Sequence, residues 1–175
     1  MRISPDTKDW TWVLERPCDQ CGFDSSSYAR EDIAGSIRSS AASWADQLGR
    51  DGVAVRTVPD KWSVLEYGCH VRDAFGVFTT RLELMLAEDG PTFENWDQDV
   101  TATEARYDRQ NPMDVAVQLT DAATVLANRF DEVADGQWDR SGTRSNGSHF
   151  TVESLGLYLI HDPIHHLWDV SLHSS

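Results

Sequence analysis

Hydrophobic positions recur at intervals of three or four residues in four stretches of the chain. These stretches cover residues 30–48, 63–86, 112–133 and 151–172. Such spacing gathers the apolar side chains on one face of a helix, which then packs against other helices. Loop-forming Gly, Pro, Asp and Asn separate the stretches. The pattern therefore predicts an all-α fold with four helices.

Local signals predict where three of these helices begin or end. Ser63 followed by Glu66 three residues later is a capping box, the usual start of a helix. Asn111 before Pro112 is a second start signal, because proline fits the first helical position without losing a hydrogen bond. Gly49 favours the end of the first helix.

The connections between the helices differ in length. About 25 residues join the second predicted helix to the third, more than a tight turn needs, so this segment is predicted to cross the bundle. The turn signal in residues 145–148 favours a short hairpin before the fourth helix. Residues 1–29 are predicted to form an N-terminal extension that packs on a bundle made of residues 30–173.

Composition excludes several function classes. A net charge of −14 opposes binding to nucleic acid or to an anionic membrane. No apolar stretch reaches the roughly 18–20 residues of a membrane span, and the first residues lack the apolar core of a secretion signal. Three cysteines do not make a disulfide framework. We therefore expect one soluble, cytoplasmic domain in a reducing compartment.

The fourth predicted helix carries three of the six histidines of the chain within residues 161–166. His161 and His165 are four positions apart, which puts both imidazoles on one helix face. His70 in the second predicted helix supplies a third nitrogen. Three imidazoles that converge between facing helices suit Zn, Ni, Fe or Mn, with a position left for water or substrate.

Two carboxylates stand one helical turn beyond these histidines. Asp73 follows His70, and Asp169 follows His165. Each is predicted to accept the distal N–H of its histidine and so fix the ring tautomer.

Other side chains near the predicted ligands receive lesser roles. His166 lies about 100° around the helix from His165 and is expected not to bind the same ion. Asp162 has a less favourable angle for supporting the ligands. Trp62 and Trp168 are expected in the core or at its rim, where they are candidates for the wall of a pocket.

Cys18 and Cys21 form a Cys-x-x-Cys motif, which is half of a zinc knuckle. A second cysteine pair is missing from the sequence, and no strand-to-helix context supports a thioredoxin-like redox role. Structural thiols, mixed metal binding and redox sensitivity all remain open for this motif.

Two segments, residues 62–73 and 161–170, together resemble the DinB-like (DinB/YfiT) superfamily of metalloenzymes. The resemblance covers residues 31–170 and is strongest to actinobacterial members related to mycothiol-dependent isomerases and S-transferases. It implies a four-helix bundle with a non-sequential helix order. It also implies a three-histidine metal site, here at His70, His161 and His165.

The leading functional hypothesis is a metal-dependent enzyme that binds a low-molecular-weight thiol, such as mycothiol, as a thiolate at the open position. The thiolate would then react with a small-molecule substrate by transfer or isomerisation. Hydrolysis by metal-activated water is the enzymatic alternative. A non-catalytic bundle that binds metal or a ligand, and a bundle without metal, are the others. A homodimer remains open.

Overall fold

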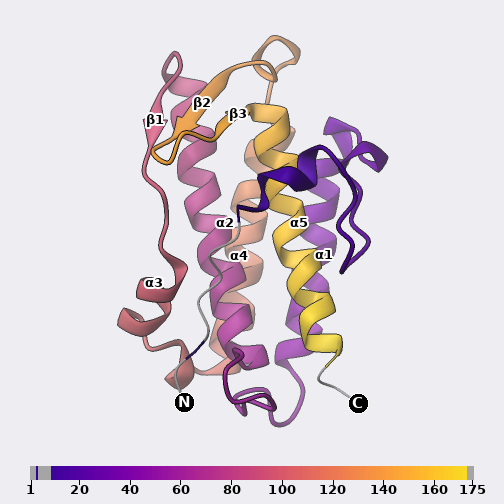
Figure 1. Cartoon of the computed structure of the whole chain (residues 1–175), viewed down its shortest axis with the longest axis vertical. Coiled ribbons are helices and arrows are strands. Elements are labelled where there is room, and N and C mark those ends of the chain that lie inside the picture. The colour runs from indigo at the N-terminus through magenta and orange to yellow at the C-terminus, as the bar shows by residue number, and fades with distance from the viewer. Residues whose placement is uncertain (1–2, 4–8, 173–175) are drawn as a thin grey trace.

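The computed structural model describes residue 3 and residues 9–172. The helices of this part of the chain are α1 (Ile33–Leu48), α2 (Val64–Ala87), α3 (Gln98–Glu104), α4 (Pro112–Asp131) and α5 (Val152–Ser171). The four long helices form a bundle, and the short α3 lies beside it (Figure 1). The predicted bundle of four long helices is confirmed, whereas the all-α class is corrected, because a small three-stranded sheet accompanies the helices.

The core lies between the four long helices. α4 packs against α1 and α2, and α5 also packs against both of them. Trp44, Phe75, Leu119 and Leu159 are fully buried in this core. α2 and α4 run in one direction along the bundle, whereas α1 and α5 run in the other (Figure 1). The apolar faces predicted from the sequence therefore meet in one interior.

The predicted helix ends match the observed caps closely. The Ser63 side chain accepts a hydrogen bond from the Glu66 amide at 3.2 Å, and the Ser63 amide donates to the Glu66 carboxylate at 2.8 Å. Asn111 accepts hydrogen bonds from the amides of Met113 and Asp114. The first helix begins at Ile33 rather than at residue 30, because residues 30–32 form a tighter 3-10 turn.

The connection between α2 and α4 runs back along the whole bundle (Figure 1). It contains α3 and the two-residue strand β1 (Thr92–Phe93). β1 pairs in parallel with β2 (Ser141–Arg144), which pairs antiparallel with β3 (His149–Thr151). The hairpin predicted before the fourth helix is thus present. The strand β1 was not predicted, because a two-residue strand carries too little sequence pattern to reveal its pairing with a distant strand.

Residues 9–29 lie against α5 (Figure 1). This segment contains short 3-10 turns at Trp10–Leu14 and Ser25–Ser27 rather than a long helix. Val13 and Phe23 anchor it through side chains that are almost completely buried. None of the helices in the described residues is long and apolar enough to cross a bilayer.

Candidate metal centre

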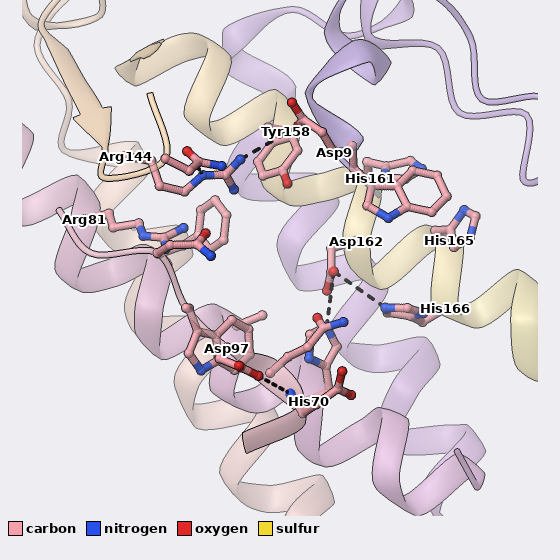
Figure 2. A pocket seen from close by; sticks show the side chains of 18 residues that line it. Asp9, His70, Arg81, Asp97, Arg144, Tyr158, His161, Asp162, His165 and His166 are labelled. Carbon is pink, nitrogen blue, oxygen red and sulfur yellow. Dashed lines mark hydrogen bonds and ion pairs between the residues drawn. The ribbon is translucent and has the colours of Figure 1, made fainter. Parts of the chain in front are cut away.

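A pocket of about 440 Å³ opens beside α2 and α5. Its wall contains His70, Asp162 and His166, with Arg81 and Arg144 on the opposite side (Figure 2). The crossing connection and the N-terminal segment complete the wall through tryptophan side chains. This volume is in the range of pockets that hold small molecules.

His70, Asp162 and His166 bring one donor atom each to the same place. The Oδ1 atom of Asp162 lies 3.2 Å from Nε2 of His70 and 3.6 Å from Nε2 of His166. One nitrogen or oxygen atom of each residue lies within 4.8 Å of the other two. His70 comes from α2, whereas the other two residues stand one turn apart on α5. The group thus joins two helices across the bundle.

Neighbouring side chains fix the two imidazole rings. Nδ1 of His166 donates a hydrogen bond to Asp169 at 2.8 Å, which leaves Nε2 facing Asp162. Trp96 stacks on His70 with the ring centroids 5.2 Å apart and an angle of 2° between the planes. The crossing connection therefore positions a histidine of α2.

The charged residues of this group shift one another's pKa values. Burial opposes the charge of Asp162, but the charges of His70 and His166 outweigh it and hold the pKa of Asp162 well below its usual range. Burial likewise opposes protonation of His166, but Asp162 and Asp169 raise its pKa to about 9. By contrast, burial and the neighbouring His165 lower the pKa of His161 to about 4.

Comparisons with known proteins place the chain in a family. The family model described as the DinB superfamily matches residues 36–170, which is more than half of the chain. The chain belongs to the DinB superfamily. This confirms the family resemblance seen in the sequence; the finer likeness to mycothiol-dependent members remains a prediction.

One solved structure shows the same fold for this DinB chain. It is YfiT from Bacillus subtilis, described as a "probable metal-dependent hydrolase with an unusual four-helix bundle topology". The match has a TM-score of 0.64 and 17% sequence identity, and it covers 98% of this chain and 91% of YfiT. A search of curated proteins gives no significant match.

The structure of this DinB chain divides the three histidines predicted as ligands between two groups. His70 lies with Asp162 and His166, whereas His161 and His165 lie with Cys18 and Cys21. The reason is the orientation of α5 about its own axis. Residues 162 and 166 occupy the helix face next to the one that carries residues 161 and 165. It is the 162/166 face that meets His70.

The two carboxylates predicted to support the ligands have different roles. Asp73 accepts hydrogen bonds from Nε of Arg72 at 2.8 Å and from the hydroxyl of Tyr107, and no hydrogen bond joins it to His70. The prediction for Asp73 is therefore corrected. Asp169 does support a histidine, but its short hydrogen bond goes to His166, and its distance to Nε2 of His165 is 3.8 Å.

The tryptophans that contribute to the pocket wall also differ from those predicted. Trp96 and Trp10 line it. Trp62 packs behind His70 with a centroid distance of 5.4 Å and lines a separate hollow of about 270 Å³. Trp168 lies 5.6 Å from His165 and does not line the pocket. The pocket wall is thus built by the crossing connection and the N-terminal segment, which helical periodicity does not describe.

Arg81 and Arg144 supply positive charge that the sequence analysis did not single out. Arg81 is 5% exposed, donates a hydrogen bond to the carbonyl of Glu94 and has no carboxylate partner among the described residues. Burial and the charge of Arg144 lower the pKa of Arg81 to about 10. Arg144 bonds Asn146 and Ser148 of its own hairpin and lies 3.8 Å from the carboxylate of Asp9. Two cationic groups therefore face the pocket from the side opposite Asp162.

Proposed function

We propose that this DinB chain is a metal-dependent hydrolase of small molecules, with His70, Asp162 and His166 holding a divalent ion. The separation of the donor atoms carries this proposal. A tetrahedral ion with bonds of about 2.0–2.1 Å keeps its donors about 3.3 Å apart. The observed distances of 3.2 and 3.6 Å from Oδ1 of Asp162 to the two imidazole nitrogens are close to that separation.

The donor set gives further support. Two imidazoles and one carboxylate are the ligands of many catalytic metal centres, and they leave coordination positions for water and substrate. A bound divalent ion supplies Lewis acidity and lowers the pKa of water. The similar YfiT structure, described as that of a probable metal-dependent hydrolase, favours the same class of reaction.

The protein's own residues have three tasks in this proposal. Asp169 holds the His166 tautomer with Nε2 toward the centre, and Trp96 holds the plane of the His70 ring. Arg81 and Arg144 bind an anionic group of the substrate, such as a carboxylate, because charge-assisted hydrogen bonds to guanidinium are strong in a buried setting. The proposed substrates are therefore small anionic esters or amides.

Hydrolysis of a panel of small esters and amides tests the proposal. We expect Zn- or Mn-loaded wild-type protein to turn over anionic members of the panel, and Asp162→Asn and His166→Ala to lose at least a hundredfold in kcat/KM. His149→Ala is the matched control, since His149 is an exposed histidine of the hairpin. Equal rates in wild type and Asp162→Asn would rule the assignment out.

The thiol-dependent reaction, which the sequence analysis assigned to His70, His161 and His165, remains the second candidate, and we place it too at the ion held by His70, Asp162 and His166. Repeating the measurements with mycothiol, bacillithiol or glutathione and an electrophile separates the two reactions. Turnover that requires the added thiol identifies a transferase or isomerase, whereas turnover without thiol identifies a hydrolase. Stoichiometric metal with no turnover under either condition would indicate a non-catalytic binding protein.

A further inference from the structure

We propose that Cys18, Cys21, His161 and His165 bind a second ion, a structural Zn²⁺, which fastens the N-terminal segment to α5. One donor atom of each residue lies within 4.8 Å of the other three. Two thiols and two imidazoles are a donor set typical of structural zinc. The two histidines complete the half knuckle from a position about 140 residues further along the chain.

The distance between donors from the two segments fits a zinc ion. Sγ of Cys18 lies 3.6 Å from Nδ1 of His165. Bonds of about 2.3 Å to sulfur and 2.0–2.1 Å to nitrogen at a tetrahedral angle require a separation of about 3.6 Å. Both cysteines are free thiols. The separation of these two donor atoms is therefore the one that a shared zinc ion requires.

The loop that carries the cysteines is folded tightly around them. The amide of Cys18 donates to the carbonyl of Phe23 at 2.7 Å, and the amide of Gly22 donates to the carbonyl of Cys18 at 2.9 Å. Gly22 has a φ of +75°, a conformation that residues with a Cβ rarely adopt. These contacts bend the Cys-x-x-Cys segment so that both thiols face α5.

The site is closed, as structural zinc sites are. Cys18, His161 and His165 are 2, 4 and 6% exposed. Nε2 of His161 is buried and has no hydrogen-bond partner among the residues that the structure describes. The Trp10 ring covers both histidines, with centroid distances of 5.4 and 4.8 Å, and Phe23 packs on His161 at 5.4 Å. Four protein donors fill a tetrahedral coordination shell, which leaves no coordination position for substrate, even though His161 and His165 also border the pocket and Cys21 is partly exposed.

Binding has a simple charge balance. Each thiol releases its proton to solvent as its sulfur–zinc bond forms, and both imidazoles bind as neutral ligands. Two thiolates then neutralise the ion, so the buried site carries no net charge. Because residues 9–29 have only short 3-10 turns, the ion would supply much of the free energy that holds this segment and Trp10 against the bundle.

Metal content and cobalt spectra of the full-length protein test the proposal. We expect His70→Ala, which disrupts only the proposed catalytic centre, to retain one equivalent of Zn²⁺. Its Co²⁺ form should show sulfur-to-cobalt charge transfer in the near ultraviolet and the intense visible bands of a tetrahedral site. Cys18→Ala and His161→Ala should lose this spectrum and have a lower Tm.

Cys69→Ala is the matched control, since Cys69 is a buried cysteine of α2 outside both groups, and it should keep the spectrum. A His70→Ala protein without charge transfer, or a Cys18→Ala protein that retains it, would overturn the proposal, as would a Cys18–Cys21 disulfide without zinc in freshly isolated protein. If Cys18→Ala does not fold, the His70→Ala spectrum decides by itself. Loss of hydrolysis in His70→Ala concerns only the catalytic centre, so the two proposals can fail separately.

Discussion

His161 and Asp162 are adjacent in the sequence but belong to two different groups of potential metal ligands. Successive residues of an α-helix are rotated by about 100°, so each of these two residues starts its own pair with a histidine one turn later. The 161/165 pair faces the N-terminal segment, and the 162/166 pair faces α2. A single helix can thereby build a closed site and an open site side by side.

Asp169 should affect metal binding by the group of His70, Asp162 and His166, whereas Asp73 should not. Asp169→Asn removes the charge that accepts the Nδ1 proton of His166, and loss of such a partner weakens metal affinity by about 10–100-fold. Asp73→Asn is the matched control because Asp73 bonds Arg72 and Tyr107 instead. Competition titration of Zn²⁺ with a chromogenic chelator measures both. Equal losses in the two variants would contradict the assignment.

Arg81 should determine a preference for anionic substrates. Arg81→Met keeps much of the side-chain volume but removes the charge, so kcat/KM for anionic esters should fall about 10–100-fold while neutral esters of the same shape are unaffected. Arg38→Met is the control, since Arg38 is on the surface and pairs with Asp131. Arg144→Met should show the same selectivity if Arg81→Met does not fold. A parallel fall for neutral esters would argue against anion binding.

The sequence predicted the helices well because their signals are local. The Ser63 cap and the Asn111 cap each depend on residues within one turn, and both are observed. The choice between the 161/165 and 162/166 pairs is different, since it depends on how α5 is rotated in the bundle. Periodicity shows that both pairs exist but not which one meets His70.

The proximity of His161 and His165 to the Cys-x-x-Cys motif was not predicted from the sequence for a related reason. Zinc motifs are recognised by regular spacing within a short segment, whereas His161 and His165 stand on a helix at the other end of the chain. The arginines of the pocket and Trp96 were missed because β1 and the crossing connection bring them together only in the folded chain.

The Glu66 carboxylate should make stability depend on pH. It accepts hydrogen bonds from Nε of Arg56 at 2.8 Å and from the amide of Ser63 at 2.8 Å. Burial opposes its ionisation, but these partners outweigh burial and lower the pKa of Glu66 below its ordinary value of 4.5. The stabilisation is therefore complete above pH 4.5 and is lost as the pH falls through the lowered pKa of the folded state.

Glu66→Gln should reduce the free energy of unfolding by about 1.5–3 kcal/mol at neutral pH, the value of hydrogen bonds to a charged group. Urea unfolding of both proteins between neutral and acidic pH measures the difference, which should shrink toward low pH. Glu83→Gln is the control, because Glu83 is exposed and pairs with Arg129 only at the surface. A difference that is constant over the whole pH range would contradict a role for the charge.

Gly156 lies where α5 packs closely against Ile33 and Phe130, so a substitution there tests this packing directly. A Cβ atom at this position would lie 2.7 Å from Cδ1 of Ile33 and 3.0 Å from Cε1 of Phe130. Both neighbours are buried and cannot move freely. Gly156→Ala should therefore lower the free energy of unfolding by about 1–3 kcal/mol, although alanine favours the helix.

Gly76→Ala on α2 is the matched control. Apart from the chain next to it in its own helix, no atom of the described residues lies within 4 Å of a Cβ built at Gly76. Alanine should therefore stabilise the protein by about 0.5–1 kcal/mol through helix propensity alone. Thermal and urea unfolding should thus give opposite signs for the two substitutions. A stabilised Gly156→Ala would mean that α5 packs less closely than these contacts require. The rotation of α5 that separates the two ligand groups would then need to be reconsidered.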